Sequence, residues 1–473
     1  MVLSALYHSI RPLPPTQKQL EEEDIDACTL YRYLPSLRGK IAWREIGRFP
    51  TPVHRCAVRL ESADTAPRSV TFWVKREDLC SDVYGGNKVR TLQHQLASCE
   101  AHAETNPGAK FIVVGSGGSN QILATTVHGL RTFGLRPQAI WLQEDAPDMD
   151  NTLNMLSTLS FPTAYIPWSQ PVAMLRALLG ALFGAGSIDK VVNLGGNSVN
   201  GVLGQMAGAL ELAEQVTAGE LPDVDALYLP VGSSCTLTGL ILGVVLARRD
   251  PALRAFRRPA FKIVAVPIHH AAAMAQRYFK IFQRPLSRYV ALAPWYGIAA
   301  AAKFVRETGG VDLEADALAF LREHVEFVTD AETVGKYGAH SARSKQAAQR
   351  YDMHGRMYGA NADGTGETMP PIWLCGHFTA KPFSVLLARL EAELEAAGKE
   401  ASNVIFWQTK SAVQPRGPKD EWERFEELTT NSSRVRRWME NGEAQSTLRP
   451  GQVSADSGHK GYRHLMKRVA VPS

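Results

Sequence analysis

The sequence predicts two three-layer α/β domains, each built on a mostly parallel sheet that helices cover on both faces. Three observations carry this prediction. The first two are that β-rich runs alternate with helix-like stretches and that Gly- and Ser-rich loops join them. The third is length, because 473 residues with 45% hydrophobic content suffice for two packed cores. We assign residues 1–90 plus 205–410 to a large domain, 91–204 to a small domain and 411–473 to a C-terminal extension.

Two stretches show the same order of strand, loop, helix and strand. The first has a strand at 110–114, the loop GSGGSNQ at 115–121, a helix and a strand at 138–143. The second has a strand at 225–231, the loop GSSCT, a helix and a strand at 261–268. This order implies right-handed crossovers between parallel strands. Ligands bind beyond the carboxyl ends of such strands, so both loops are expected to border one cleft.

The remaining segments are expected at the periphery. Residues 358–371 are rich in Gly, Asp, Thr and Pro and indicate an inserted surface loop. From residue 411 the chain is polar and charge-mixed, with one short helix expected around the segment DEWERFEEL. This extension either wraps the body, covers the cleft or a partner subunit, or stays mobile.

Composition excludes several classes of partner. The net charge of +5 is spread thinly, without a basic block for nucleic acid or a membrane surface. The apolar stretch at 172–186 contains Arg176 and is too short to span a bilayer. Six cysteines without a CxxC pair argue against a zinc site or a disulfide scaffold, and favour a cytoplasmic location. We predict no metal, and leave His128, His269 and His270 as structural.

Three loops carry the candidate chemistry. In VGSSCTLTG (231–239), small and hydroxylated residues open a helix, so the loop is either a phosphate cradle or a hydroxyl-capped turn. In GSGGSNQ, Ser119 and Asn120 stand at a helix start, where Ser119 is either functional or an N-cap. In YGGNKVR (84–90), two glycines and an asparagine precede Lys88, which is either a solvated charge or a nucleophile in the cleft.

Six motifs, in order, resemble those of pyridoxal-phosphate enzymes of the tryptophan-synthase-β fold type. They are FPTPV (49–53), WVKREDL (73–79), YGGNKVR, GSGGSNQ, GGNSVNGVLG (195–204) and VGSSCTLTG. The chain is similar in particular to the 1-aminocyclopropane-1-carboxylate deaminase and D-cysteine desulfhydrase family, over about residues 45–410. The resemblance implies pyridoxal phosphate held in the interdomain cleft, mainly by the large domain, and a homodimer.

The resemblance also assigns roles to residues. Lys88 carries the cofactor as a Schiff base, Asn120 contacts its phenolic oxygen, and Ser119 and Tyr337 act in catalysis. The implied cofactor-binding residues are Asn87, Lys88, Asn120, Gly232, Ser233, Ser234, Cys235, Thr236 and Thr379. The implied substrate-binding residues are Ser119, Asn120, Gln121, Asn197, Tyr337 and Phe378.

The sequence departs from this family at several positions. Phe378 stands in place of a second active-site tyrosine and cannot transfer a proton. Thr379 stands where a residue faces the pyridine nitrogen, and a hydroxyl stabilises a pyridinium less than a carboxylate does. Lys410 and Ser411 replace glycines that usually follow the threonine, and Ser234 and Cys235 replace glycines of the phosphate loop. These departures indicate an altered substrate or reaction.

We therefore expect a lyase or deaminase that acts at Cα and Cβ of a small amino acid, with D-amino acids and cyclic amino acids among the candidates. Its products would be a 2-oxo acid and ammonia. Two alternatives stay open. One is β-replacement or carbon-bond formation on an altered substrate, and the other is a family member that lost catalysis and acts as a binding protein.

Overall fold

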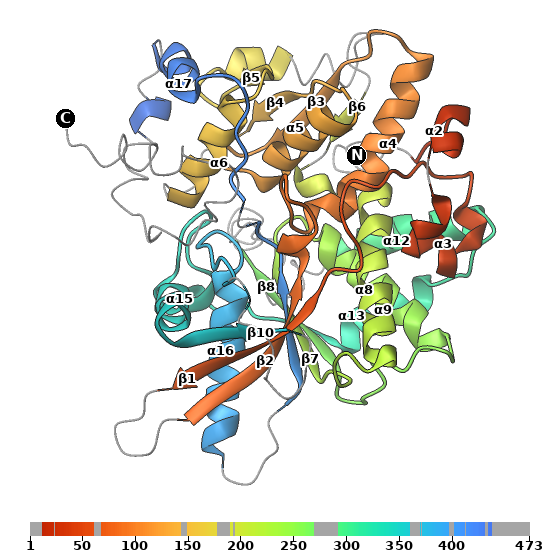
Figure 1. Ribbon diagram of the computed structural model, residues 1–473, viewed down its shortest axis with the longest axis vertical. Coiled ribbons are helices and arrows are strands. Elements are labelled where there is room, and N and C mark those ends of the chain that lie inside the picture. The colour runs from red at the N-terminus through yellow and green to blue at the C-terminus, as the bar shows by residue number, and fades with distance from the viewer. Residues whose placement is uncertain are drawn as a thin grey trace, which may run out of the picture.

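The computed structural model describes residues 12–437, except 23, 61–67, 143–148, 177–189, 193, 269–291, 360–368, 370, 397–401, 412 and 431–433. Within these residues the strands form two sheets (Figure 1). The larger sheet has seven strands in the order β10 (Gly355–Tyr358), β1 (Val53–Leu60), β2 (Arg68–Arg76), β11 (Val404–Gln408), β7 (Ala226–Val231), β8 (Lys262–Pro267) and β9 (Val325–Phe327). The smaller sheet has four strands in the order β5 (Tyr165–Ile166), β4 (Gln138–Trp141), β3 (Phe111–Gly115) and β6 (Lys190–Val192).

Both sheets are mostly parallel, as the sequence predicts. In the larger sheet, β2, β11, β7, β8 and β9 pair in parallel, whereas β1 is antiparallel to both β2 and β10. All pairs of the smaller sheet are parallel. The strands expected at 110–114, 138–143, 225–231 and 261–268 are β3, β4, β7 and β8, so these four predictions are confirmed.

Helices cover the larger sheet on both faces (Figure 1). On one face lie α8 (Val199–Ala218), α9 (Cys235–Arg249), α12 (Leu292–Glu307) and α13 (Glu314–Glu323). On the other lie α15 (Ala342–His354) and α16 (Ala380–Glu395). Neighbouring residues of one strand serve both faces: Leu227 and Leu229 pack with α8 and α9, and Tyr228 packs with α16. Parallel strands therefore read as continuous apolar runs, which is what made them visible in the sequence.

The smaller sheet packs against helices and part of the C-terminal extension. Its helices are α5 (Asn120–Thr132) and α6 (Met149–Leu159), and α17 (Glu421–Thr429) joins α6. Phe425 of α17 shares a buried cluster with Val113, Trp141 and Leu156. The short helix expected in this extension is confirmed, and the described part of the extension packs onto the body.

The remaining helices are short or lead into the site. They are α2 (Gln17–Glu22), α3 (Thr29–Tyr33), α4 (Lys88–Thr105) and α14 (Ala331–Val334). Among the described helices, none has both the length and the apolar character that a membrane span requires. Most of the expected insert at 358–371 lies outside the described residues, and so do His269 and His270. The domain boundaries stay a prediction.

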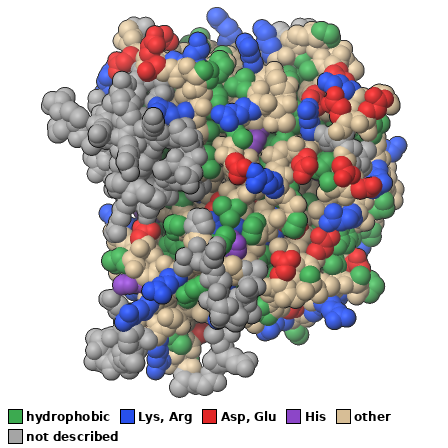
Figure 2. All heavy atoms as spheres, viewed as in Figure 1, with side chains coloured by type: hydrophobic (Ala, Val, Ile, Leu, Met, Phe, Trp, Pro, Cys, Tyr) green, Lys and Arg blue, Asp and Glu red, His purple; other side chains and the backbone are tan. Residues whose placement is uncertain are grey.

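The face of the molecule in Figure 2 carries acidic and basic side chains side by side. Among the described side chains of this face, no extended basic area stands out. The absence of a nucleic-acid partner stays a prediction.

Candidate active site

A tight turn between β2 and α4 places Lys88 at the first position of its helix. Two glycines make the turn possible. A Cβ on Gly85 would lie 2.2 Å from the carbonyl oxygen of Asp78. Gly86 has a φ of +106°, and a Cβ there would lie 2.5 Å from the carbonyl oxygen of Thr409. Only glycine fits both positions, so the YGGN segment fixes where Lys88 begins the helix.

A buried ion network holds the start of α4 against β2 and α8. Arg90 Nε donates to Glu77 Oε2 at 2.6 Å, and Arg90 Nη2 donates to Glu211 Oε1 at 2.9 Å. Lys75 pairs with Glu211 and donates to the carbonyl oxygen of Thr51 at 2.7 Å. These four charged side chains are at most 2% exposed. Charges at this depth are stable only with partners, so the network ties the turn to the surrounding elements.

The Lys88 side chain lines a cavity and donates from Nζ to the carbonyl oxygen of Gly195 at 3.0 Å. The surrounding protein removes water from the amine, and this desolvation lowers the pKa of Lys88, while Cys235 raises it to a smaller extent. The net direction is down. A larger fraction of the amine is therefore uncharged than in an exposed lysine, as a nucleophile requires.

The serine-rich turn after β7 borders the same cavity. Gly232, Ser233 and Ser234 connect β7 to α9, and the backbone N–H groups that open α9 have no partners within the helix itself. Ser234 has a φ of +67°, which is unusual for a residue with a side chain. Asn87 Nδ2 donates to Thr236 Oγ1 at 2.8 Å, so this turn is joined directly to the one that carries Lys88.

A third segment supports the serine-rich turn. Gly195 has a φ of +63°, and a Cβ there would lie 2.4 Å from Ser233 Oγ. Ser233 Oγ donates to the carbonyl oxygen of Gly195 at 3.3 Å. Asn197 Nδ2 donates to the carbonyl oxygen of Ser233 at 2.6 Å. The GGN segment therefore holds the serine-rich turn in place through its contacts with Ser233.

The start of α5 forms a further part of the cavity. Ser119 Oγ accepts from Ile122 N at 3.4 Å, so Ser119 is the N-cap of α5. Asn120 Oδ1 accepts from Tyr84 Oη at 3.0 Å and from Asn154 Nδ2 at 2.6 Å. The N-cap interpretation of Ser119 is confirmed, and its position on the cavity leaves the functional one available.

Aromatic side chains close another part of the cavity. Tyr337 Oη lies 3.4 Å from Ser116 Oγ. The Tyr337 and His377 rings meet edge to face with centroids 4.5 Å apart, and His377 stacks on Phe378 at 4.0 Å. Tyr337 is the only one of these rings on the cavity that carries a hydroxyl, since Phe378 lines it with an unsubstituted ring.

The structure brings most of the expected site residues together around this cavity of about 250 Å³. Those that line it are Asn87, Lys88, Ser119, Asn120, Gln121, Gly232, Ser233, Ser234, Cys235, Thr236, Tyr337 and Phe378. Two others do not line it. Asn197 contacts the lining residue Ser233 through the backbone carbonyl oxygen of that residue. The Thr379 hydroxyl is fully buried, donates to the carbonyl oxygen of Trp373 at 2.8 Å and accepts from Cys375 N at 2.9 Å.

Sequence reasoning missed several lining residues. Ser116 belongs to the GSGGSNQ loop, and Gly195 to the GGN segment, so both lay inside motifs already singled out. Thr409 follows β11 directly, and the rule that sites form at the carboxyl ends of parallel strands could have found it.

The residues of this cavity fit pyridoxal phosphate. The phosphate of this cofactor needs donors, and the serine-rich turn supplies hydroxyl groups and backbone N–H groups at a helix start. Its aldehyde reacts with an uncharged amine, and the lowered pKa of Lys88 favours that form. Of the described residues that line the cavity, none is Asp or Glu. The cavity is therefore suited to ligands that carry phosphate and carboxylate groups.

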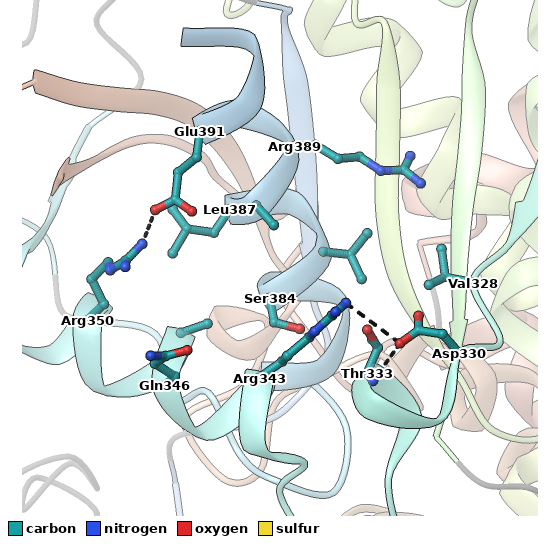
Figure 3. Close-up of a pocket in the computed structure, with 13 residues that line it drawn as sticks. Val328, Asp330, Thr333, Arg343, Gln346, Arg350, Ser384, Leu387, Arg389 and Glu391 are labelled. Atoms are coloured by element: carbon teal, nitrogen blue, oxygen red, sulfur yellow. Dashed lines mark hydrogen bonds and ion pairs between the residues drawn. The ribbon is translucent and has the colours of Figure 1, made fainter. Parts of the chain in front are cut away.

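A second cavity, of about 430 Å³, lies between α15 and α16 (Figure 3). Its arginines are already paired: Arg350 with Glu391, Arg343 with Asp330 at 3.8 Å, and Arg389 with Glu326. Among the described residues that line it there is no lysine, and its arginines have carboxylate partners, so this cavity is less suited to an amine-reactive cofactor. Within the described chain, no cluster of His, Cys, Asp and Glu could hold a metal. His128 is buried and lies 2.9 Å from the carbonyl oxygen of Tyr84.

The fold and this cavity define a class of enzyme that binds an amine-reactive phosphorylated cofactor. The family model described as pyridoxal-phosphate dependent enzyme matches residues 45–288, just over half of the chain. The chain belongs to this family of pyridoxal-phosphate-dependent enzymes. The sequence-based prediction of a pyridoxal-phosphate-dependent enzyme is thereby confirmed.

Curated relatives cover part of the chain. A nocardicin C-9' epimerase from Nocardia uniformis subsp. tsuyamanensis is 33% identical over 210 residues, which are 43% of this chain and 61% of that protein. A mitochondrial bifunctional D-cysteine desulfhydrase/1-aminocyclopropane-1-carboxylate deaminase from Arabidopsis thaliana is 25% identical over 224 residues, 45% of this chain and 53% of that protein. The chain thus spans between half and two thirds of the length of these relatives.

A solved structure described as an ACC deaminase homologue superimposes with a TM-score of 0.51 at 17% identity. The match covers 85% of this chain and 99% of that one. At this identity the likeness establishes the fold alone. The similarity to the deaminase and desulfhydrase family, predicted from six motifs, is confirmed by the family model and by the Arabidopsis thaliana relative.

Proposed function

We propose that this enzyme removes the Cα proton of a small amino acid and then eliminates a group from Cβ. Water completes the reaction, so that the products are a 2-oxo acid, ammonia and the protonated leaving group. The observation that carries this proposal is Lys88, an amine of lowered pKa on a cavity that also holds the serine-rich turn. Pyridoxal phosphate, when bound, joins the substrate's amine and withdraws electrons from its Cα.

Four residues would hold the cofactor. Lys88 would bind its aldehyde carbon through Nζ, and Asn120 would donate a hydrogen bond to its phenolic oxygen. Ser233 and Thr236 would donate to its phosphate, together with the backbone N–H groups at the start of α9. The bond from Asn87 to Thr236 at 2.8 Å would keep the amine and the phosphate site in register.

The ring nitrogen would face a hydroxyl. Thr409 lines the cavity, whereas the hydroxyl of Thr379 is engaged with Trp373 and Cys375. No carboxylate among the described lining residues is available to stabilise a protonated ring nitrogen, so electron withdrawal is weaker. A substrate with a good leaving group on Cβ tolerates this weakness better than one whose strained ring must open.

Proton transfer would fall to groups that line the cavity. Lys88 Nζ, once displaced by the substrate's amine, is the base for the Cα proton. Ser119, or Tyr337 with Ser116 Oγ at 3.4 Å, would return a proton or donate one to the leaving group. A placed acid or base of this kind contributes about 10²- to 10⁴-fold in rate.

Epimerisation at Cα is a second candidate. The 33% identity to an epimerase favours this candidate. Epimerisation at Cα, like elimination, begins with removal of the Cα proton. It needs two proton-transfer groups at Cα, and Lys88 together with Tyr337 or Ser119 would supply them. The two functions share their first step and differ in whether a Cβ group leaves.

The test is a screen of small D- and L-amino acids in deuterated water, with Lys88→Ala beside the parent protein. We expect a 2-oxo acid and ammonia in equal amounts from at least one substrate, and a loss of more than about 10⁴-fold in Lys88→Ala. Lys303→Ala, whose side chain is 63% exposed on α12, should match the parent.

The products separate the alternatives. Deuterium at Cα with inverted configuration and no 2-oxo acid would favour epimerisation. A new adduct in the presence of thiols or carbon acids would favour β-replacement. A shift in the visible spectrum without any product or exchange would favour a binding protein, and full activity in Lys88→Ala would remove all the catalytic proposals.

A further inference from the structure

Lys410 is a second lysine beside the candidate site, and the residue is only 1% exposed. It follows Thr409 after β11, and its backbone forms an antiparallel bridge with Gly86 of the Lys88 turn. Lys410 Nζ donates to Asn154 Oδ1 at 2.8 Å and to Asn120 Oδ1 at 3.2 Å. The ammonium group also lies 4.4 Å from the centroid of the Trp373 ring.

A lysine ammonium only donates hydrogen bonds, so both amides must turn their oxygen atoms toward it. Asn154 then presents Nδ2 to Gly118 O at 2.8 Å and to Asn120 Oδ1 at 2.6 Å. Tyr84 Oη adds a third donor to Asn120 Oδ1 at 3.0 Å. With its oxygen held by three donors, Asn120 has its Nδ2 group left for the cavity that it lines.

We propose that Lys410 is a positioning residue, which orients the Asn120 amide and polarises it, so that its N–H group donates more strongly to the cofactor's phenolic oxygen. The proposal rests on the proposed function, in which Asn120 donates to that oxygen. A cation on the far side of an amide withdraws electrons from it and strengthens its N–H donors. Lys410 thereby favours the deprotonated, more negative form of the bound cofactor.

The test is a pH titration of the visible absorbance of the cofactor-loaded protein, which a merely structural role would not shift. Lys410→Met removes the charge at similar volume, and we expect the midpoint to rise by about one pH unit, a tenfold change in proton affinity. Lys410→Arg keeps a donor-only cation and should return the midpoint to within about 0.3 unit of the parent.

Lys381→Met is the matched control. Lys381 is also fully buried, but its Nζ donates to two backbone carbonyl oxygens, those of Ile268 at 3.0 Å and Lys336 at 2.9 Å. Its loss should leave the midpoint unchanged. An equal rise in Lys381→Met, or no rise in Lys410→Met, would overturn the proposal.

Two further outcomes are covered. If Lys410→Met does not fold, Tyr84→Phe replaces it, because it removes one donor from Asn120 Oδ1. A rise then supports the proposal, and no rise overturns it. The parent spectrum could also stay constant with pH. In that case a pH-dependent change in the Lys410→Met spectrum supports the proposal, and a Lys410→Met spectrum that also stays constant overturns the proposal. A parent protein that gains no visible absorbance with pyridoxal phosphate would instead refute the proposed function.

Discussion

Two walls of the cavity, named here for their roles in the proposed function, differ in how they are built. The cofactor wall consists of Lys88, Gly195, Ser233, Ser234 and Thr236, and backbone geometry fixes it. Gly195 and Ser234 have positive φ angles, and the turn before Lys88 accepts only glycine at two positions. A buried ion network then secures α4. These constraints restrict which residues can occupy the turns, so short sequence motifs identify this wall without a structure.

The substrate wall consists of Ser116, Tyr337 and Phe378, with His377 behind them. Side-chain contacts define it: an edge-to-face pair, a stacked pair and one long hydroxyl contact of 3.4 Å. Such contacts tolerate substitution while the backbone stays the same. In the proposed function, the cofactor-binding residues therefore depend on turns, whereas the choice of reaction depends on a few exchangeable side chains.

The largest expected effect concerns the support of the cofactor wall. Arg90→Met would leave Glu77 and Glu211 with one cation fewer at full burial. We expect the free energy of unfolding to fall by about 3–5 kcal/mol in urea titrations. Arg44→Met is the matched control, since Arg44 pairs with Glu100 while 26% exposed, and should cost about 1 kcal/mol or less. Equal losses would show that the buried network does not stabilise this wall.

The next effect tests the backbone of the same wall. Gly195→Ala places a Cβ 2.4 Å from Ser233 Oγ at a φ of +63°. We expect the Kd for pyridoxal phosphate, measured on cofactor-free protein, to rise about 10- to 100-fold. Gly134→Ala has the same backbone strain, with a φ of +64°, but nothing within 4 Å of the new Cβ. A matching loss of affinity in Gly134→Ala would contradict this account.

The substrate wall should respond differently. Phe378→Tyr adds a hydroxyl to a ring that lines the cavity, and so supplies a possible proton donor. We expect the ratio of 2-oxo acid formation to Cα deuterium exchange to change about 10-fold. The Kd for the cofactor should stay within about 2-fold of the parent value. If the affinity changed and the ratio did not, the division into two walls would be wrong.

The smallest effect concerns strain in the serine-rich turn. Ser234→Gly relieves a φ of +67°, and the gain exceeds the entropy that glycine adds to the unfolded chain. We expect the cofactor-free protein to gain about 0.5–1 kcal/mol in thermal or urea unfolding. Ser233→Gly, at a position without a positive φ, should instead destabilise the protein. A loss of stability in Ser234→Gly would indicate that its side chain matters more than its backbone.

The sequence predicted the parallel strands and most of the cofactor wall because each depends on local residue order. It did not predict the ion network, since Lys75 and Glu211 are 136 residues apart. Thr379 was expected on the cavity, but a turn directs its hydroxyl to the backbone of Trp373 and Cys375. Its role toward the pyridine nitrogen stays a prediction. The sequence shows Lys410 only as a replacement of a glycine that the resembled family has at this position. Its contacts could not be predicted, because its partners Asn120 and Asn154 lie on helices of the other sheet.

The most direct measurement is borohydride reduction of the cofactor-loaded protein, followed by mass spectrometry of its peptides. Reduction fixes the cofactor to whichever amine binds it. The account predicts one modified peptide, with the cofactor on Lys88. Modification of Lys410 or of another lysine, with Lys88 unmodified, would contradict it.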